Sequence, residues 1–203
     1  MTVFWRQGYE GASMADLTRA MGINPPSLYA CFGSKEDLFK AVLERYDQRR
    51  NNFMESVVAA STVAQVAETF LMGVAAFASD TSGKTPPGCL MLQGGLSCGD
   101  TTIPDTLARH RAEKEAILRN RFEQAKKEGE LARDVDAASL ARYLMVMSNG
   151  ICVQAAAGAT LKELREVAAI ALSNWPVKDA DPMVANKSEK ASAGSRLVAV
   201  RPA

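Results

Sequence analysis

Three helix starts are crowded into the stretch SMADLTRAMGINPPSLYACFGSKED, residues 13–37. Ser13 and Ser34 are each followed three residues later by an aspartate, which is the pattern of a capping box. Asn24 is a preferred N-cap, and the proline pair after it suits the first turn of a helix, where amide hydrogens have no intrahelical acceptor. A glycine follows each of the two short segments, as helix ends require. The stretch therefore predicts a helix-turn-helix followed by a third helix.

The rest of the chain is also helical in pattern. Apolar residues recur at three- and four-residue spacing, and we find no alternating pattern typical of strands. The sequence therefore predicts an all-α fold. The expected helices are Met14–Met21, Pro25–Phe32, a long helix from Ser34 to Val57, Val63–Ala78, a short helix or turn over Cys89–Cys98, Asp105–Glu128, Asp136–Ala157 and Leu161–Trp175. Beyond Pro176 the composition of the chain indicates a disordered tail over residues 176–203.

Composition narrows the classes of partner. The 203 residues carry a formal net charge of +1, so contact with nucleic acid has to come from local geometry rather than from an overall basic field. No long apolar run or signal pattern occurs, and we expect a soluble, cytoplasmic protein without a membrane segment. The chain has four widely spaced cysteines and one histidine, which predict neither a metal site nor a disulfide framework. We therefore expect no cofactor, and reduced, mostly buried thiols.

The segment FWRQGYEGASMADLTRAMGINPPSLYACFGSKEDLFKAVLERY, Phe4–Tyr46, resembles the DNA-binding domain of TetR-type transcriptional regulators. It carries, in order, a Gly-Tyr pair before the Ser-Met cap, the turn, the Leu-Tyr pair and the run Ser-Lys-Glu-x-Leu-Phe. The remainder is similar to the family's effector-binding domain in architecture only, and PPGCLMLQGGLSCGD looks like a segment of some subgroups. The resemblance implies a helix-turn-helix domain over 1–46 with an incomplete first helix, an effector-binding and dimerisation domain over 47–175, and the tail.

The resemblance also implies that the second helix of the motif enters the major groove of an operator. Carried over residue by residue, it assigns base contacts to Pro25, Pro26, Ser27 and Ala30, and backbone contacts to Ser13, Met14, Tyr29 and Lys35. This helix has no Arg, Lys or Gln, so thymine methyl contacts and DNA shape have to supply more of the specificity. We expect the helix starts at Ser13 and Asn24 to offer amides and dipole ends to phosphate.

Two further departures concern the N-terminal domain. Only Met1 to Gln7 precede the Gly-Tyr pair, so part of the apolar surface of Leu17, Met21, Leu28 and Phe32 is expected to lack cover. Either the true start lies upstream, or the DNA-binding domain is weakened. Cys31 is expected in the core.

Candidate effector contacts combine polar and soft side chains on apolar helix faces. They are Cys89, Leu92, Gln93, His110, Lys114, Leu118, Met147 and Ile151. Ordinary packing is the competing interpretation of these residues. Cys89 and Cys98 also raise the hypothesis of thiol sensing, but no basic residue next to either in the sequence lowers its pKa, and inert core thiols are the alternative.

The sequence as a whole predicts a ligand-responsive regulator, most simply a repressor. The last two helices suit a homodimer, which implies a palindromic operator. The alternative is a helical small-molecule-binding or interaction protein that has lost DNA binding. An enzyme is not predicted, because the chain shows no nucleophile–base motif, phosphate loop or metal spacing.

Overall fold

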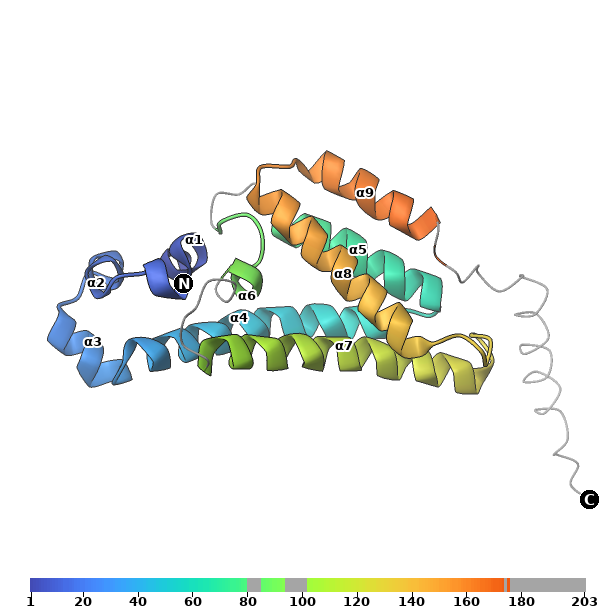
Figure 1. Cartoon of the computed structure of the whole chain (residues 1–203), viewed down its shortest axis with the longest axis horizontal. Helices are drawn as coiled ribbons and strands as arrows, with labels where there is room; N and C mark the ends of the chain where they lie inside the picture. The colour runs from blue at the N-terminus through green and yellow to red at the C-terminus, as the bar shows by residue number, and fades with distance from the viewer. Residues whose placement is uncertain (80–84, 94–101, 174, 176–203) are drawn as a thin grey trace, which may run out of the picture.

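The computed structural model describes residues 1–79, 85–93, 102–173 and 175 (Figure 1). All regular structure in these residues is α-helical, which confirms the predicted fold class. The helices are α1 (Thr2–Gly11), α2 (Met14–Met21), α3 (Pro25–Phe32), α4 (Lys35–Val58), α5 (Val63–Ala78), α6 (Leu90–Gln93), α7 (Thr102–Glu128), α8 (Ala137–Ala156) and α9 (Leu161–Ser173). The predicted tail and Cys98 lie outside the described residues.

The three predicted caps form as expected. The side chains of Ser13, Asn24 and Ser34 accept a hydrogen bond from the amide three residues later, at 3.1, 2.9 and 3.0 Å. Gly22 ends α2 in the left-handed conformation, with φ 68°. These local signals explain why α2 and α3 have the predicted bounds.

The helix α1 covers much of the apolar surface of the N-terminal domain. Phe4 is completely buried and meets the Phe39 ring edge-on, with the ring centroids 4.9 Å apart. Leu17 of α2 and Leu28 of α3 are also buried. Met21 and Phe32, in contrast, are 39% and 36% exposed, so the expected lack of cover is limited to these two side chains.

Cys31 is exposed, and its predicted place in the core is wrong. Only Leu28 of α3 is buried, because this two-turn helix presents a narrow apolar stripe to α2 and α4. Cys31 lies outside that stripe.

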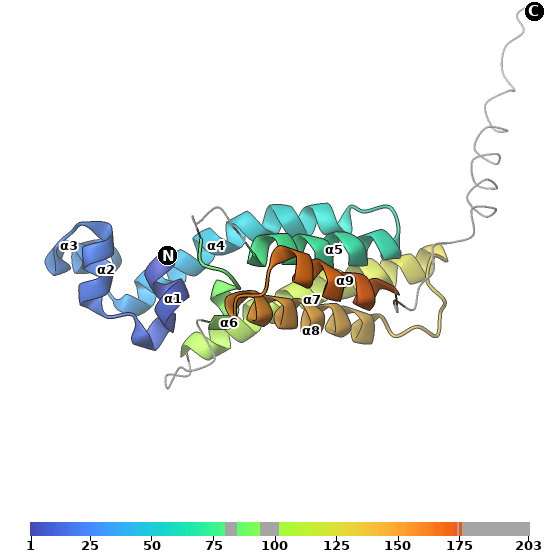
Figure 2. The ribbon, with the colours of Figure 1, turned by 90° about the horizontal axis from the view of Figure 1, so that it is seen from above.

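The helix α4 begins beside α3 and continues through the C-terminal bundle (Figures 1 and 2). In the bundle, α8 packs against α5 and α7, and α9 packs against α5 and α8. The helix α7 begins at Thr102, three residues earlier than predicted, because Pro104 lies in the first turn, where proline removes no intrahelical hydrogen bond. Trp175 lies beyond α9 and is buried near Phe122, with ring centroids 6.0 Å apart.

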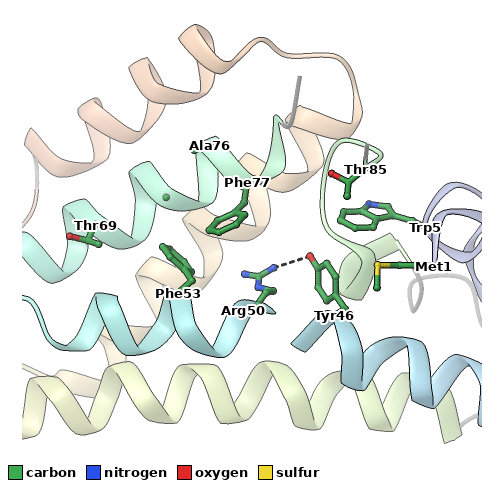
Figure 3. Close-up of a pocket in the computed structure, with 10 residues that line it drawn as sticks. Met1, Trp5, Tyr46, Arg50, Phe53, Thr69, Ala76, Phe77 and Thr85 are labelled. Carbon is green, nitrogen blue, oxygen red and sulfur yellow. Dashed lines mark hydrogen bonds between the residues drawn. The ribbon is translucent and has the colours of Figure 1, made fainter. Parts of the chain in front are cut away.

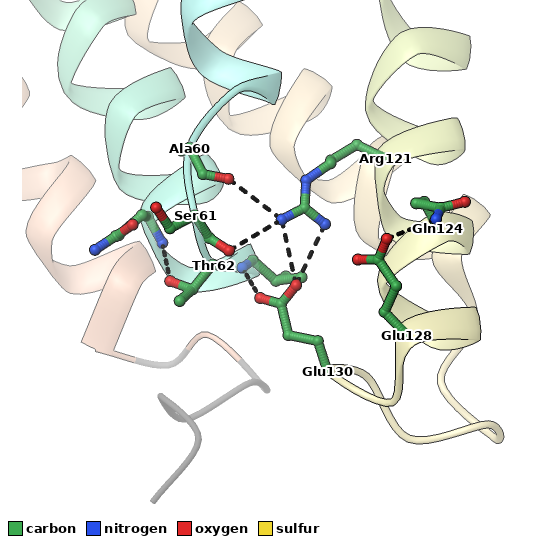
Figure 4. A network of polar contacts seen from close by, with 9 residues as sticks. Ala60, Ser61, Thr62, Arg121, Gln124, Glu128 and Glu130 are labelled. Atoms are coloured by element: carbon green, nitrogen blue, oxygen red, sulfur yellow. Dashed lines mark hydrogen bonds and ion pairs between the residues drawn. The ribbon is translucent and has the colours of Figure 1, made fainter. Parts of the chain in front are cut away.

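A polar network holds the end of the bundle farthest from α3 (Figure 4). Arg121 of α7 donates to the carbonyl oxygens of Ala60 and Ser61 at 3.3 and 3.4 Å, and forms an ion pair with Glu130 at 3.2 Å. The Glu130 carboxylate also accepts a hydrogen bond from the amide of Val63, the first residue of α5. The network therefore ties the α4–α5 turn to the end of α7.

Candidate functional site

The helix α3 presents one side to solvent. All of the residues assigned to base contact, Pro25, Pro26, Ser27 and Ala30, are exposed, and so is Tyr29, at 49%. Leu28 points the other way, into the domain core. The structure therefore brings the proposed base contacts together on one accessible surface.

Of the residues assigned to the DNA backbone, Tyr29 lies on α3 itself, and Ser13, Met14 and Lys35 lie at helix starts beside it. Ser13 is exposed at the N-terminus of α2, and Met14 is half-buried. Lys35, in the first turn of α4, donates to the Glu10 carbonyl oxygen at 3.4 Å, and its Nζ lies 4.6 Å from the centre of the Tyr9 ring. These contacts hold the lysine charge against α1.

The first turn of α3, residues 25–28, offers phosphate no free amide, so the amides expected at this helix start cannot come from these four residues. Pro25 and Pro26 have no amide hydrogen, the Ser27 amide donates to the Asn24 side chain, and the Leu28 amide donates to the Asn24 carbonyl oxygen at 3.2 Å. The first helical residues of α2 and α4, in contrast, have amides without an intrahelical acceptor.

A cavity of about 560 Å³ lies between α1, α4 and α5 (Figure 3). Its lining residues are Met1, Trp5, Tyr46, Arg50, Phe53, Thr69, Gly73, Ala76, Phe77 and Thr85. A Cβ atom on Gly73 would lie 2.3 Å from the Phe53 ring, so the glycine lets this ring approach α5 closely. The walls are mostly apolar with a few polar groups, as small-molecule sites require.

Arg50 is the charged group of this cavity. Its Nη1 atom donates to the Tyr46 hydroxyl and to the Cys89 sulfur, at 3.2 Å each. Among the described residues no carboxylate forms an ion pair with it. Burial of a guanidinium is costly without an anionic partner, so this arginine favours an anion beside it.

The thiols of Cys89 and Cys152 are both buried and lie within hydrogen-bonding reach of each other. A hydrogen bond from Cys152 and the charge of Arg50 lower the pKa of Cys89 well below that of a free thiol, against the opposing effect of burial. The same hydrogen bond and burial raise the pKa of Cys152. The pKa of Tyr46 is raised chiefly by burial. These effects favour a thiolate at Cys89 over one at Cys152.

Four of the predicted effector contacts surround a second, smaller cavity of about 30 Å³ next to the thiols. They are Cys89, Leu92, His110 and Lys114. The two basic side chains are already engaged by Asp47 of α4, with His110 Nδ1 at 3.3 Å and Lys114 Nζ at 3.0 Å from its carboxylate oxygens. Their contacts join α7 to α4.

The other four predicted effector contacts line neither of these cavities. Leu118 and Ile151 are buried in the bundle core, and Gln93 and Met147 are half-buried. In contrast, sequence reasoning missed Trp5, Arg50 and Phe53. The spacing of Tyr46, Arg50 and Phe53 at three- and four-residue intervals on one predicted helix was the signal that could have placed them on one face.

Comparison with known proteins identifies the family. Residues 1–42 match the model of a family described as bacterial regulatory proteins, tetR family. Over 181 residues the chain is 35% identical to the HTH-type transcriptional repressor ComR of Escherichia coli (strain K12), covering 87% of this chain and 85% of that protein. The chain belongs to the TetR family. As a TetR family protein, it is a DNA-binding transcriptional regulator and not an enzyme.

Solved structures of TetR family members agree with the fold. A cysteine mutant of the regulator CifR, complexed with 26-bp double-strand operator DNA, matches with a TM-score of 0.80 and 36% identity, covering 86% of this chain and 92% of that one. The repressor BdcR of Escherichia coli (strain K12) is 52% identical over 44 residues, 22% of each chain.

None of the described helices combines the length and the apolar character needed to cross a membrane. No three metal-binding side chains come together among the residues whose positions are described.

Proposed function

We propose that this TetR family chain is a repressor that binds a palindromic operator as a homodimer and is released by a small-molecule effector. The observation that carries the proposal is the position of the larger cavity. Trp5 of α1 and Tyr46 of α4 form part of its wall, and both helices also support the helix-turn-helix. An occupant of the cavity therefore touches the DNA-binding domain directly.

In this proposal residues 1–46 bind DNA. The exposed side of α3 enters the major groove, with the contacts assigned above, and the start of α2 and the charge of Lys35 face the phosphates. With no Arg, Lys or Gln on α3, apolar contact to thymine methyls and DNA shape carry the specificity. Because its ligand is genomic DNA, we place the protein in the cytoplasm.

Residues 47–175 form the dimer and, together with Met1, Trp5 and Tyr46, bind the effector. Exposed apolar side chains gather on α8 and α9, whereas Leu144, Ala155 and Ala168 of the same helices are buried in the chain's own core. The exposed ones are Tyr143, Val146, Val153, Val167 and Ile170. An exposed apolar surface of this kind on two adjacent helices suits a two-fold four-helix interface.

The effector acts by its differential affinity for two states of the dimer. In one state the two α3 helices are spaced for successive major grooves, and in the other they are not. The helix α4 links the two sites because it carries Tyr46 and Arg50 at the cavity and begins directly after α3.

DNA binding is tested by fluorescence anisotropy of the purified chain with fragments from its own upstream region, at two salt concentrations. We expect binding to one short palindrome that weakens steeply as salt rises, because phosphate contacts release counterions. A shuffled fragment of the same length and composition is the control. Equal affinity for both fragments would contradict the proposal.

The cavity is tested with the fluorescent dye anilinonaphthalene sulfonate, an apolar anion that suits apolar walls and Arg50. We expect Ala76→Phe, which adds a ring to the cavity wall, to reduce dye binding and leave operator binding intact. Ala138→Phe, at an exposed position of α8, is the matched control and should bind dye like the parent. Equal dye binding by all three proteins would exclude this cavity as the effector site.

A helical ligand-binding protein that has lost DNA binding is the second candidate. The observations that favour it are the uncharged α3 and the absence of a free amide at its start. Dye binding in the cavity without operator binding would select this candidate.

A further inference from the structure

Two thiols and a cation from three separate elements converge beside the larger cavity. Cys89 immediately precedes α6, Cys152 belongs to α8, and Arg50 belongs to α4. The Cys89 sulfur accepts from Arg50 Nη1 at 3.2 Å and from the Tyr46 hydroxyl at 3.4 Å, and the Cys152 thiol lies within hydrogen-bonding reach. Arg50 lines both cavities, so this cluster borders the space assigned to the effector.

The backbone before Cys89 is built for a close approach to α8. Gly88 has φ +92°, and a Cβ atom there would lie 3.1 Å from the Cys152 carbonyl oxygen and 3.0 Å from the Ala156 Cβ. A residue with a side chain would strain the backbone and push it away from α8. The glycine therefore holds the two thiols near each other.

We propose that Cys89 and Cys152 form a redox pair, in which a hydroperoxide oxidises Cys89 and Cys152 then closes a disulfide between the start of α6 and α8. In the first step the Cys89 thiolate attacks a peroxide oxygen, the O–O bond breaks, and the leaving alkoxide or hydroxide takes up a proton. Cys89 is then a sulfenic acid.

In the second step the Cys152 sulfur attacks the Cys89 sulfur. The S–O bond breaks, the S–S bond forms, and the departing hydroxide leaves as water with the proton of the Cys152 thiol. Two electrons pass from the two thiols to one hydroperoxide, which is reduced to an alcohol or to water. A cellular thiol reverses the step by exchange.

The surroundings decide which thiol reacts first. Arg50 and Tyr46 of α4 donate hydrogen bonds to Cys89, which stabilise its thiolate. The other charged or titratable groups around the same small cavity are Cys152 on α8 and His110, Arg111 and Lys114 on α7. Asp47 of α4 engages His110 and Lys114, and Arg111 donates to the Met91 carbonyl oxygen, so Arg50 is the cation that favours the anion at Cys89. Cys89 is therefore the attacking thiol and Cys152 the resolving one.

Oxidation also has a route to the DNA-binding domain, a consequence that rests on the proposed function. A disulfide removes the thiolate, so Arg50 and Tyr46 lose their acceptor. Tyr46 meets the Trp5 ring of α1 edge-on, with centroids 5.1 Å apart and planes at 89°. Rearrangement at Tyr46 therefore changes the contact between α4 and α1, and we expect oxidised protein to bind the operator about tenfold more weakly, as typical allosteric coupling allows.

The formation of the Cys89–Cys152 disulfide is tested by treating the full-length protein with hydrogen peroxide. Free thiols are then blocked, and the peptides are analysed by mass spectrometry. We expect a Cys89–Cys152 crosslink that dithiothreitol reverses. In Cys152→Ser we expect sulfenic acid at Cys89, trapped by dimedone, and no crosslink. Cys31→Ser, which removes the exposed thiol, is the control and should behave like the parent. A crosslink from Cys89 to Cys98, or no oxidation of Cys89, overturns the proposal.

The role of Arg50 is tested through the pH dependence of Cys89 alkylation by iodoacetamide. In the parent the rate should stay high at pH values where a free thiol is mostly protonated, because Arg50 stabilises the anion. Arg50→Gln should shift this profile to higher pH, and Arg50→Lys should restore it. Circular dichroism checks that each variant is folded. Superimposed profiles for all three proteins would overturn the assignment of Arg50.

The effect of oxidation on DNA binding is tested by fluorescence anisotropy of labelled operator DNA with reduced and with oxidised protein. We expect weaker binding on oxidation in the parent and no crosslink-dependent change in Cys152→Ser. If the crosslinked protein binds the operator with unchanged affinity, the proposed effect of oxidation on DNA binding is overturned, but the redox pair is not. Reduced protein that fails to bind any operator contradicts the proposed function, while the crosslink measurement remains decisive for the thiols.

Discussion

Tyr29 is the exposed aromatic residue of the proposed recognition helix that carries a hydroxyl group. It is 49% exposed on α3, beside the proposed base contacts. If its hydroxyl donates to a phosphate, Tyr29→Phe removes one hydrogen bond and keeps the ring, which should weaken operator binding about threefold to tenfold. The slope of affinity against salt should not change, because tyrosine is neutral.

The measurement is an operator titration at several salt concentrations. Ser56→Ala, which removes an exposed hydroxyl from α4 outside the proposed dimer surface, is the control and should bind like the parent. Unchanged affinity in Tyr29→Phe would place the hydroxyl away from the phosphates.

At the residue scale, the sequence predicted side chains well where the determinant is local. The caps at Ser13, Asn24 and Ser34 depend on residues three positions away, and all three are confirmed. The thiol cluster could not be found this way. Arg50 and Cys89 lie 39 residues apart in the chain, and only the packing of α4 against the start of α6 and α8 brings the cation to the sulfur.

The second prediction concerns an element, the helix α3. The Asn24 side chain accepts a hydrogen bond from the Ser27 amide at 2.9 Å. Because Pro25 and Pro26 have no amide hydrogen, this is one of few hydrogen bonds that stabilise the helix start. Asn24→Ala should lower the free energy of unfolding by about 1 kcal/mol, the usual value of an N-cap. Urea denaturation followed by circular dichroism measures this change.

Asn24→Gly is the control for the cap, because glycine at this position usually costs only a few tenths of a kcal/mol. Equal losses in the two variants would mean that the side chain contributes through another contact.

At the scale of elements, helix propensity and capping residues are enough to predict most helix boundaries, but not all of them. The bounds of α3 and α5 match the predicted ones. The start of α7 was predicted too late, since proline is compatible with a first turn as well as with a break. Cys31 was misplaced because a short helix with a narrow buried stripe gives periodicity too little length to distinguish its two sides.

For the whole molecule, the prediction is that dimerisation and DNA binding are lost together. Val153 of α8 is 51% exposed within the proposed dimer surface. Val153→Asp would bury a carboxylate there, which should give a monomer of unchanged helix content. We expect light scattering to report the monomer, and operator binding to fall at least about tenfold because two half-sites are no longer bound together.

Ala132→Asp, in the exposed segment after α7, introduces the same group outside this surface and is expected to remain dimeric. A dimeric Val153→Asp protein would exclude this surface as the interface.

At the scale of the whole molecule, the sequence was least informative about the position of the cavity. The family resemblance assigned base contacts to residues that lie on one exposed side of α3, and their role in DNA binding stays a prediction. The cavity was expected among residues of the C-terminal helices, yet its wall includes Trp5 and Tyr46 from the N-terminal segment. A cavity is the space that side chains from several helices leave unfilled when they pack. The periodicity of apolar residues in one helix therefore cannot predict a cavity that lies between three helices.

The position of Trp5 has a practical consequence. The chain has two tryptophans, and only Trp5 lines the larger cavity, while Trp175 is packed near Phe122 in the bundle. Intrinsic emission from Trp5 should therefore change when a molecule enters the cavity, and Trp5→Phe should abolish the change while Trp175 supplies a constant background. The protein thus carries an optical reporter of its own occupancy, and a search for the natural effector needs no label.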